Sequence, residues 1–159
     1  MVVGKPPFQV LLDTHREEVF RFLVAAAGPG EADDCFQETF LSALRAYPRL
    51  RDGSNLRAWL LKIASNKAID AHRSRQRRPA PAEQLPESAS GPAGPPRESD
   101  PDLWSAVRAL PPRQRASILH RYVSDLPYAE IGRVVGCSDE AARRNVHEGL
   151  KKLRGAWNA

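Results

Sequence analysis

Polar side chains able to read DNA bases gather in the stretch "SDEAARRNVHEGLKKLR", residues 138–154. Arg143, Arg144 and Asn145 are consecutive there. Arginine can donate two hydrogen bonds to a guanine edge and asparagine can pair doubly with adenine, so this triplet suits sequence reading in the major groove. Solvated helices with several arginines are also common. The stretch by itself therefore leaves a plain surface helix as an equal interpretation.

The spacing of apolar residues predicts the helix that must carry these side chains. Ala142, Val146, Leu150 and Leu153 recur at helical intervals, which places them on one inward face. The candidate DNA-contacting residues of the stretch are Ser138, Arg143, Arg144, Asn145, His147, Glu148 and Lys151. Ser138 can also cap the start of the helix. The acids that follow it suit the positive end of the helix dipole but would repel phosphates.

A short helix and a tight turn precede this longer helix. The stretch "PYAEIGRVV" begins at Pro127, and Gly136 ends it. A helix of about eight residues, a glycine-containing turn and a longer second helix form a helix-turn-helix. This combination favours DNA binding over a plain surface helix.

Charge divides the chain into three blocks. Residues 1–78 carry 13 basic and 9 acidic residues, residues 79–100 carry 1 and 4, and residues 101–159 carry 10 and 6. The middle block is rich in proline and poor in bulky apolar residues, which predicts a flexible acidic linker between two domains. The net charge of +5 indicates an anionic partner, with nucleic acid as the leading candidate.

The first block reads as helical throughout, and the predicted fold class is all-α with two small helical domains. Apolar residues repeat at helical spacing from Phe8 to Leu23, and Gly28-Pro29-Gly30 ends that helix. A second helix carries the stripe Ala32, Phe36, Phe40, Ala43, Leu44 and Tyr47. After the turn "PRLRDGSN", a third helix carries the stripe Leu56, Trp59, Leu60, Ile63, Ala64 and Ala71. Its opposite face holds Lys62, Ser65, Asn66 and Arg73, with Ile69 as an apolar exception.

The third block begins with residues that favour the start of a helix. Asp100 can cap a helix whose first residue is Pro101. After the pair Pro111-Pro112, a further helix carries the stripe Ile118, Leu119, Tyr122 and Val123. No run of alternating β-branched residues is long enough to indicate a sheet.

The sequence lacks the features that are typical of several classes of protein. Cys35 and Cys137 lie far apart without a CxxC motif or a histidine cluster, which disfavours zinc sites and disulfides. No apolar run approaches the ~20 residues that span a bilayer, and the N-terminus lacks the layout of a signal peptide. The sequence therefore predicts a cytoplasmic protein with no metal, cofactor or membrane insertion.

Three longer stretches share the pattern of one family. "DDCFQETFLSALRAY" is similar to D-x-x-Q-E-T-F-L, and "NLRAWLLKIASNKAIDAHR" is similar to N-P-R-A-W-L…I-A-x-N…A-I-D. "LPPRQRASILHRYVSDLPYAEIGRVVGCS" follows L-P-x-R-Q-R…Y-x-E-I-A-x-x-L-G. In order and spacing, the chain resembles the extracytoplasmic-function group of bacterial RNA polymerase sigma factors.

The resemblance implies a role for each block. Residues 1–78 would be sigma domain two, residues 101–159 sigma domain four, and residues 79–100 the linker. Core-polymerase docking would involve Asp34, Gln37, Glu38, Phe40 and Leu41. Recognition and melting of the −10 promoter element would involve Arg49, Arg51, Asn55, Lys62, Asn66, Lys67 and Arg73. The helix of residues 138–154 would read the −35 element. Core RNA polymerase and promoter DNA are the implied partners, an anti-sigma factor is a further one, and no enzymatic activity is implied.

The chain also departs from the family pattern. Leu44 stands where the family usually has tryptophan, Leu56 replaces a proline, and Ser65 replaces a common arginine. In the reading helix, Arg144 and Asn145 replace serine and arginine, and Glu148 replaces arginine. These changes bear on the choice of promoter rather than on the general role.

Three alternatives remain open on the sequence. The main one is a helix-turn-helix regulator that binds duplex operators without polymerase. A metal-dependent nuclease could use Asp33, Asp34 and Glu38, although no general base or fourth ligand is evident. A module that only sequesters polymerase is the third.

Overall fold

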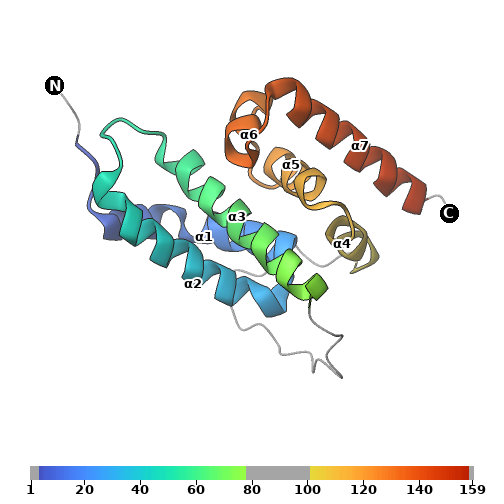
Figure 1. Cartoon of the computed structure of the whole chain (residues 1–159), viewed down its shortest axis with the longest axis horizontal. Coiled ribbons are helices and arrows are strands. Elements are labelled where there is room, and N and C mark those ends of the chain that lie inside the picture. Colours follow the sequence, from blue (N-terminus) through green and yellow to red (C-terminus); the bar gives the residue numbers. More distant parts are fainter. Residues whose placement is uncertain (1–3, 78–100, 158–159) are drawn as a thin grey trace.

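The protein is an all-α molecule with two helical lobes, as Figure 1 shows. The computed structural model describes residues 4–77 and 101–157, and within these ranges it contains no strand. The helices are α1 (Phe8–Ala27), α2 (Pro29–Ala46), the short 3-10 helix η1 (Tyr47–Arg49), α3 (Leu56–Arg77), α4 (Pro101–Arg108), α5 (Pro112–Tyr122), α6 (Tyr128–Val135) and α7 (Asp139–Trp157). The predicted fold class is confirmed. The linker prediction and the proposed cap at Asp100 lie outside the described residues.

Lobe one, residues 4–77, is a three-helix unit built from α1, α2 and α3. Its centre is apolar, and Phe22, Leu23 and Leu60 are fully buried. α1 and α2 are joined by a single residue, Gly28, whose φ of 88° lets the chain reverse there. Pro29 then occupies the first turn of α2, where its missing N–H costs no hydrogen bond.

Lobe two, residues 101–157, contains α4 to α7, and α6 and α7 form the helix-turn-helix. Gly136 ends α6 in the left-handed conformation, with a φ of 84°, as the glycine signal predicted. Ser138 caps α7, because its Oγ accepts a hydrogen bond of 3.1 Å from the backbone N–H of Ala141. α5 packs closely on α7 at Gly149, where an added Cβ would lie 2.3 Å from Cδ1 of Ile118. A side chain at position 149 would force the end of the Ile118 side chain to move.

Three sequence predictions about which side of a helix is buried are wrong in detail. Leu44 and Tyr122 were assigned to apolar stripes, but they are 51% and 62% exposed. Ser65 was assigned to the polar face of α3, but it is 1% exposed. The reason is the same in each case: helical spacing identifies faces, but only the neighbouring helices decide which face is covered.

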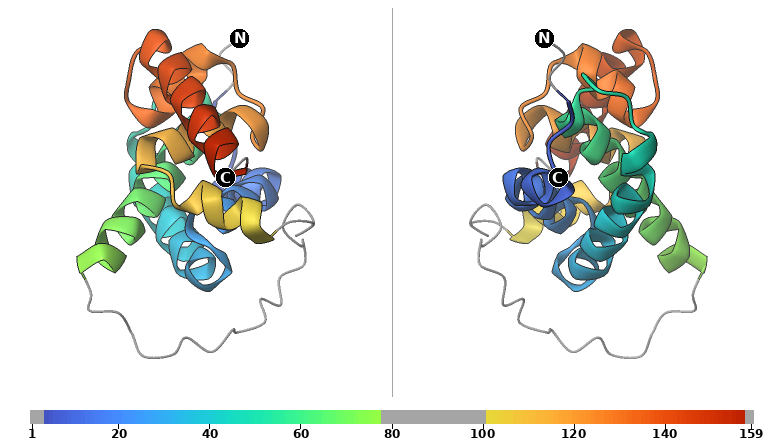
Figure 2. Two further views of the ribbon diagram at one scale, coloured as in Figure 1. Left: turned by 90° about the vertical axis from the view of Figure 1, so that its right-hand side faces the viewer. Right: turned by 90° about the vertical axis from the view of Figure 1, so that its left-hand side faces the viewer.

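The two lobes pack against each other rather than standing apart. α3 lies along α6 and touches α5, and α1 lies against α4 and α5. Figure 2 shows the helices of lobe two seated on lobe one from two further directions. Buried residues of both lobes, including Phe22 and Leu61 from one and Leu119 and Leu126 from the other, belong to one continuous apolar cluster. This arrangement is not readable from the sequence.

Candidate nucleic-acid and polymerase interfaces

The predicted reading helix α7 has one buried face and one solvent face. Ala142 and Val146 are 0% and 2% exposed and anchor the helix on lobe two. Most of the predicted DNA-contacting residues are exposed: Ser138, Arg143, Arg144, His147 and Lys151. Their helix therefore presents an exposed basic surface with donors of the kind that can read base edges in a major groove.

The solvent face of α7 is not uniform. Asn145 and Glu148 are half-buried, so they lie at its edges. The guanidinium of Arg143 lies over the ring of Tyr128, 5.1 Å from its centroid, and this cation–π contact holds Arg143 toward α6. Arg144 is exposed and projects into solvent from the same turn. Arg144 is therefore the better placed of the two arginines to reach a base.

A second basic surface follows α3 and the loop before it. Among its predicted residues Arg49, Arg51, Asn55, Lys62, Asn66 and Arg73 are exposed, and Lys67 is half-buried. Asn55 has a structural duty as well. Its Oδ1 accepts a hydrogen bond of 3.1 Å from the backbone N–H of Ala58 and so caps α3. The cap connects the loop conformation to the start of the helix.

A third surface, on α2, combines acidic and apolar side chains. Asp34, Gln37 and Glu38 are exposed, and Leu41 beside them is 51% exposed. Leu44 lies one turn further along and is equally exposed, so it joins this face rather than the core. Phe40 is only 7% exposed, and its ring lies 4.8 Å from that of Phe36. Phe40 therefore packs inside lobe one beneath this surface. The sequence had predicted it to be among the residues that contact core polymerase.

A groove of about 330 Å³ runs between α2 and α3 beside this surface. Asp34, Glu38 and Asp70 line it together with Lys67. At its base, burial and then the neighbouring carboxylates raise the pKa of the Cys35 thiol to about 11, so this cysteine stays protonated at neutral pH. Within residues 4–77 and 101–157, no set of three or more His, Cys, Asp or Glu side chains is placed to hold a metal ion. The nuclease interpretation therefore lacks a metal site in the described part of the chain.

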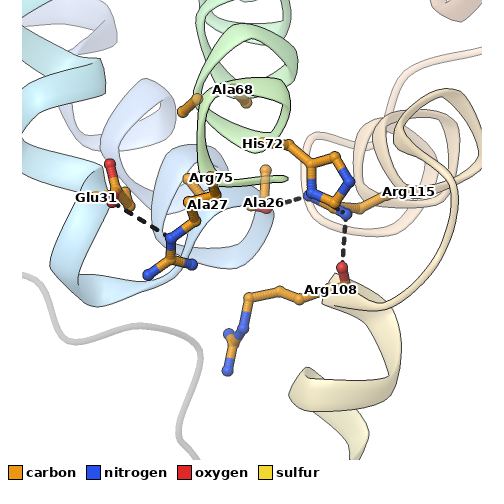
Figure 3. Close-up of a pocket in the computed structure, with 9 residues that line it drawn as sticks. Ala26, Ala27, Glu31, Ala68, His72, Arg75, Arg108 and Arg115 are labelled. Atoms are coloured by element: carbon orange, nitrogen blue, oxygen red, sulfur yellow. Dashed lines mark hydrogen bonds and ion pairs between the residues drawn. The ribbon is translucent and has the colours of Figure 1, made fainter. Parts of the chain in front are cut away.

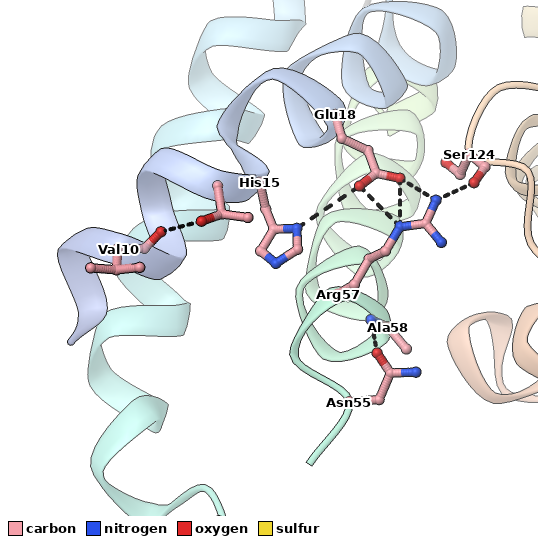
Figure 4. A network of polar contacts seen from close by, with 8 residues as sticks. Val10, His15, Glu18, Asn55, Arg57, Ala58 and Ser124 are labelled. Carbon is pink, nitrogen blue, oxygen red and sulfur yellow. Dashed lines mark hydrogen bonds and ion pairs between the residues drawn. The ribbon is translucent and has the colours of Figure 1, made fainter. Parts of the chain in front are cut away.

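Polar contacts cross between the lobes, and the sequence did not predict them. The Arg57 guanidinium pairs with Glu18 inside lobe one at 2.9 Å and also donates to the backbone oxygen of Ser124 in lobe two (Figure 4). Asn55 Nδ2 donates to Glu130 Oε1 at 3.3 Å. These contacts tie the start of α3 to α6 and to the segment that leads into it.

A histidine lies at the centre of the contact between the lobes. His120 is fully buried; its Nε2 is 2.5 Å from Ser65 Oγ, and its ring stacks on Phe22 with centroids 4.2 Å apart. Burial, followed by the charge of Arg57, lowers the pKa of His120 to about 3. The histidine is therefore neutral in this arrangement at any physiological pH.

An arginine joins the lobes at their other end. Arg115 on α5 is 5% exposed and donates to the backbone oxygen of Ala26 at 3.0 Å and to that of Arg108 at 2.5 Å. Figure 3 shows its guanidinium beside His72 of α3, whose Nδ1 is 3.0 Å away. One buried side chain thus satisfies carbonyls at the ends of α1 and α4.

Comparison with known proteins identifies the family. Residues 11–78 match the family described as "Sigma-70 region 2", and residues 102–153 match "Sigma-70, region 4". The chain is 34% identical over 152 residues to the RNA polymerase sigma factor CarQ of Myxococcus xanthus, with 92% of this chain and 87% of CarQ covered. It belongs to the sigma-70 family of RNA polymerase sigma factors, in the extracytoplasmic-function group.

Other relatives agree with this membership. The sigma factor is 36% identical over 156 residues to the ECF RNA polymerase sigma factor SigD of Mycobacterium tuberculosis, covering 91% of this chain and 74% of SigD. Its fold matches that of the sigma factor RpoE from Bartonella quintana, solved with the anti-sigma factor NepR, at a TM-score of 0.74, 20% identity and 96% and 97% coverage of the two chains. CnrH, solved with the cytosolic domain of CnrY, matches at a TM-score of 0.68, 20% identity and 95% and 87% coverage.

None of the helices within residues 4–77 and 101–157 is long and apolar enough to cross a membrane.

Proposed function

We propose that this sigma factor binds core RNA polymerase through α2 and engages promoter DNA through two separate basic surfaces, on α3 and on α7. The observation that carries the proposal is that each lobe presents its own exposed basic helix, within the family regions matched at 11–78 and 102–153. A regulator with a single helix-turn-helix needs only one such surface. The stand-alone regulator is accordingly not favoured.

The polymerase-docking role is assigned to Asp34, Gln37, Glu38, Leu41 and the neighbouring Leu44. Exposed leucines beside carboxylates suit a protein partner, because apolar side chains supply buried area while the charges orient the approach. They suit DNA poorly, since the carboxylates repel phosphates. Phe40 positions this face from inside the lobe.

The −10 element is assigned to the loop Arg49–Asn55 and to the exposed face of α3. Taking a base out of a duplex costs a few kcal/mol, and a loop that holds the displaced base offsets that cost. Lys62, Lys67 and Arg73 follow along α3, where cations can hold the phosphates of the separated strand. The exposure of Lys62 and Arg73 on one helix, with Lys67 half-buried between them, supports the assignment.

The −35 element is assigned to α7. Arg144 and His147 are exposed at its centre, and Lys151 lies one turn beyond them, within reach of the phosphate backbone. The acids of its first turn argue for entry with the middle of the helix, and not its N-terminus, deepest in the groove.

The proposal extends to partners and location. RpoE was solved with the anti-sigma factor NepR and CnrH with the cytosolic domain of CnrY, and we infer that an anti-sigma factor also controls this chain. The sigma factor would act in the cytoplasm, as a binding and melting factor that contributes no catalytic residue of its own.

Reconstituted transcription on fragments of genomic DNA tests the proposal. Core polymerase with this chain should start transcription at a defined set of promoters, whereas core polymerase alone should not. The isolated chain should show little selective binding to duplex DNA. Tight selective duplex binding without any affinity for core polymerase would contradict the sigma assignment and restore the regulator.

A further inference from the structure

We propose that a small cavity beside the second half of α3 binds a phosphate group, supplied either by free inorganic phosphate or by a small phosphomonoester. The cavity has a volume of about 50 Å³, which is more than a single water needs. His72 and Arg75 line it from α3, Arg108 from α4 and Arg115 from α5. The inference goes beyond the proposed function, because this binding site involves neither polymerase nor promoter DNA.

Positive charge is concentrated around this cavity. Arg75, Arg108 and Arg115 place three guanidinium groups at its walls, and Glu31 is the only acid among the described residues that line it. The Glu31 carboxylate lies 3.4 Å from Arg75 Nε, so it is directed at one of the three cations. Figure 3 shows the side chains of Arg75 and Arg108 reaching into the space between α3 and α4. The walls therefore carry more positive than negative charge.

The most deeply buried of these cations is Arg115, which is 5% exposed. Its guanidinium donates to the backbone oxygens of Ala26 and Leu110, each at 3.0 Å, and these acceptors carry no full charge. Burial, followed by the charge of Arg108, lowers the pKa of Arg115. A buried cation is costly unless an opposite charge lies close to it, and a bound anion would supply that charge.

His72 adds a neutral donor to the same wall. Its Nδ1 lies 3.0 Å from a terminal nitrogen of Arg115, and a guanidinium can only donate, so Nδ1 is the acceptor. The proton of the neutral imidazole therefore sits on Nε2. Burial, then Arg115 and Arg75, lower the pKa of His72, which keeps the ring neutral at pH 7.5.

Arg108 is the residue that a purely structural explanation leaves unused. Its side chain is half-buried and passes over the turn between α1 and α2, where a Cβ on Gly28 would lie 3.7 Å from its Cδ. Within residues 4–77 and 101–157, no hydrogen bond or ion pair occupies its guanidinium. Arg115 binds backbone carbonyls and so has a structural duty, whereas the donors of Arg108 remain available for a ligand.

The shape and chemistry of the cavity favour a terminal phosphate. Guanidinium groups form paired hydrogen bonds with phosphate oxygens, and several of them around one centre suit a tetrahedral dianion better than a carboxylate. Ala26, Ala27 and Ala68 are buried and form an apolar wall. A phosphodiester within a DNA strand continues on both sides, so it does not fit a cavity of about 50 Å³ closed by this wall.

Calorimetric titration of the full chain with inorganic phosphate, at pH 7.5 and constant ionic strength, tests the site. The wild type should bind phosphate saturably, and Arg108→Gln should bind it at least tenfold more weakly. The matched control is Arg113→Gln, which removes an exposed arginine of α5 that does not line the cavity, so the loss of charge is the same. That control should bind like the wild type. Equal affinities of the two variants, or heat that never saturates, would mark an adventitious ion only and overturn the site.

A second variant covers the case in which circular dichroism shows that Arg108→Gln is unfolded. The side chain of Arg75 is 46% exposed, so Arg75→Gln should keep the fold, and it should weaken phosphate binding at least threefold relative to Arg113→Gln. Affinity equal to that of Arg113→Gln would overturn the site. Loss of phosphate binding with normal promoter-directed transcription would refute the cavity and leave the sigma function intact.

Two further ligands identify the source of the phosphate. Adenosine monophosphate binding more tightly than inorganic phosphate would assign the site to phosphomonoesters, and the reverse order would assign it to free phosphate. Dimethyl phosphate, a diester with a single charge, should bind at least tenfold more weakly than inorganic phosphate. Dimethyl phosphate binding as tightly as inorganic phosphate would overturn the assignment to a terminal phosphate.

Discussion

At the scale of single residues, neighbouring side chains of one type have different duties. Arg143 is drawn toward Tyr128, while Arg144 projects freely from the same turn of α7. Asn55 both caps α3 and lies in the proposed −10 loop. Substitutions at these positions therefore need controls that separate folding from recognition.

Arg144→Ala should change which base is preferred at one position of the −35 element, because a bidentate contact to guanine is lost. The expected change in binding free energy is about 1–3 kcal/mol at that position and near zero elsewhere. Lys152→Ala, an exposed lysine on the same helix, should instead weaken binding uniformly and reduce the salt dependence. Affinity measured on a panel of single-base variants distinguishes the two. A uniform loss in Arg144→Ala would reassign that residue to phosphate contact.

Asn55→Asp should keep the helix cap and still impair promoter opening. The carboxylate can accept the hydrogen bond from Ala58 N–H, but it has no amide donor and adds a negative charge beside DNA. Thermal unfolding should therefore resemble that of the wild type, while permanganate footprinting should show less strand opening. Asn55→Ala should lose both, with a stability cost of about 1 kcal/mol. Normal opening by Asn55→Asp would remove Asn55 from the −10 surface.

At the scale of elements, α2 shows how one helix serves core and surface. Phe40 packs inward on Phe36, while Leu41 and Leu44 are half exposed beside the acids. An exposed leucine pair on a charged face is costly to keep unless a partner covers it. This exposed pair is the reason for proposing α2 as the docking element of lobe one.

Leu41→Asp should weaken binding to core polymerase at least tenfold with little effect on unfolding, because the side chain is already in solvent. The matched control is Val10→Asp on α1, which changes an equally exposed apolar residue on another helix and should leave polymerase binding intact. Co-migration with core polymerase in native gels measures both. Phe40→Ala, in contrast, should destabilise lobe one by about 3–5 kcal/mol. Similar polymerase affinity of Leu41→Asp and Val10→Asp would argue against docking through α2.

At the scale of the whole molecule, the neutral His120 links the packing of lobe two on lobe one to pH. Its pKa is about 3 when the lobes are packed, against an ordinary value of 6.5, so protonation favours any state in which the histidine meets water. The groups that act on it are Ser65, the ring of Phe22 and the charge of Arg57. His72 at the other end has a pKa lowered by burial and by Arg115, which adds to the effect with the same sign.

The packing of the two lobes on each other should therefore be independent of pH well above pH 6.5 and weaken as the pH falls below it. If only His120 titrates, the ratio of chains with packed lobes to chains with separated lobes should fall about tenfold for each pH unit below 6.5. Scattering between pH 7.5 and 5.0 measures this ratio, with far-ultraviolet circular dichroism to show that the helices persist. His120→Gln should flatten the profile, while His147→Gln, on the exposed face of α7, should not. A pH-independent radius in the wild type would contradict the role of His120.

The sequence by itself determined the helices, the residues that start and end them, and the motifs of the family. These features depend on residues close together in the chain. Apolar spacing in α7, Gly136 and the Ser138 cap are local signals, and the structure has them as predicted. Only the tertiary structure decided that Ser65 and His120 are buried and that Leu44 is exposed. Ser65 meets His120 across 55 positions of the chain, and no local pattern encodes such a pair. The packing of the lobes depends on the fit of two distant surfaces, so it appears only when both are folded.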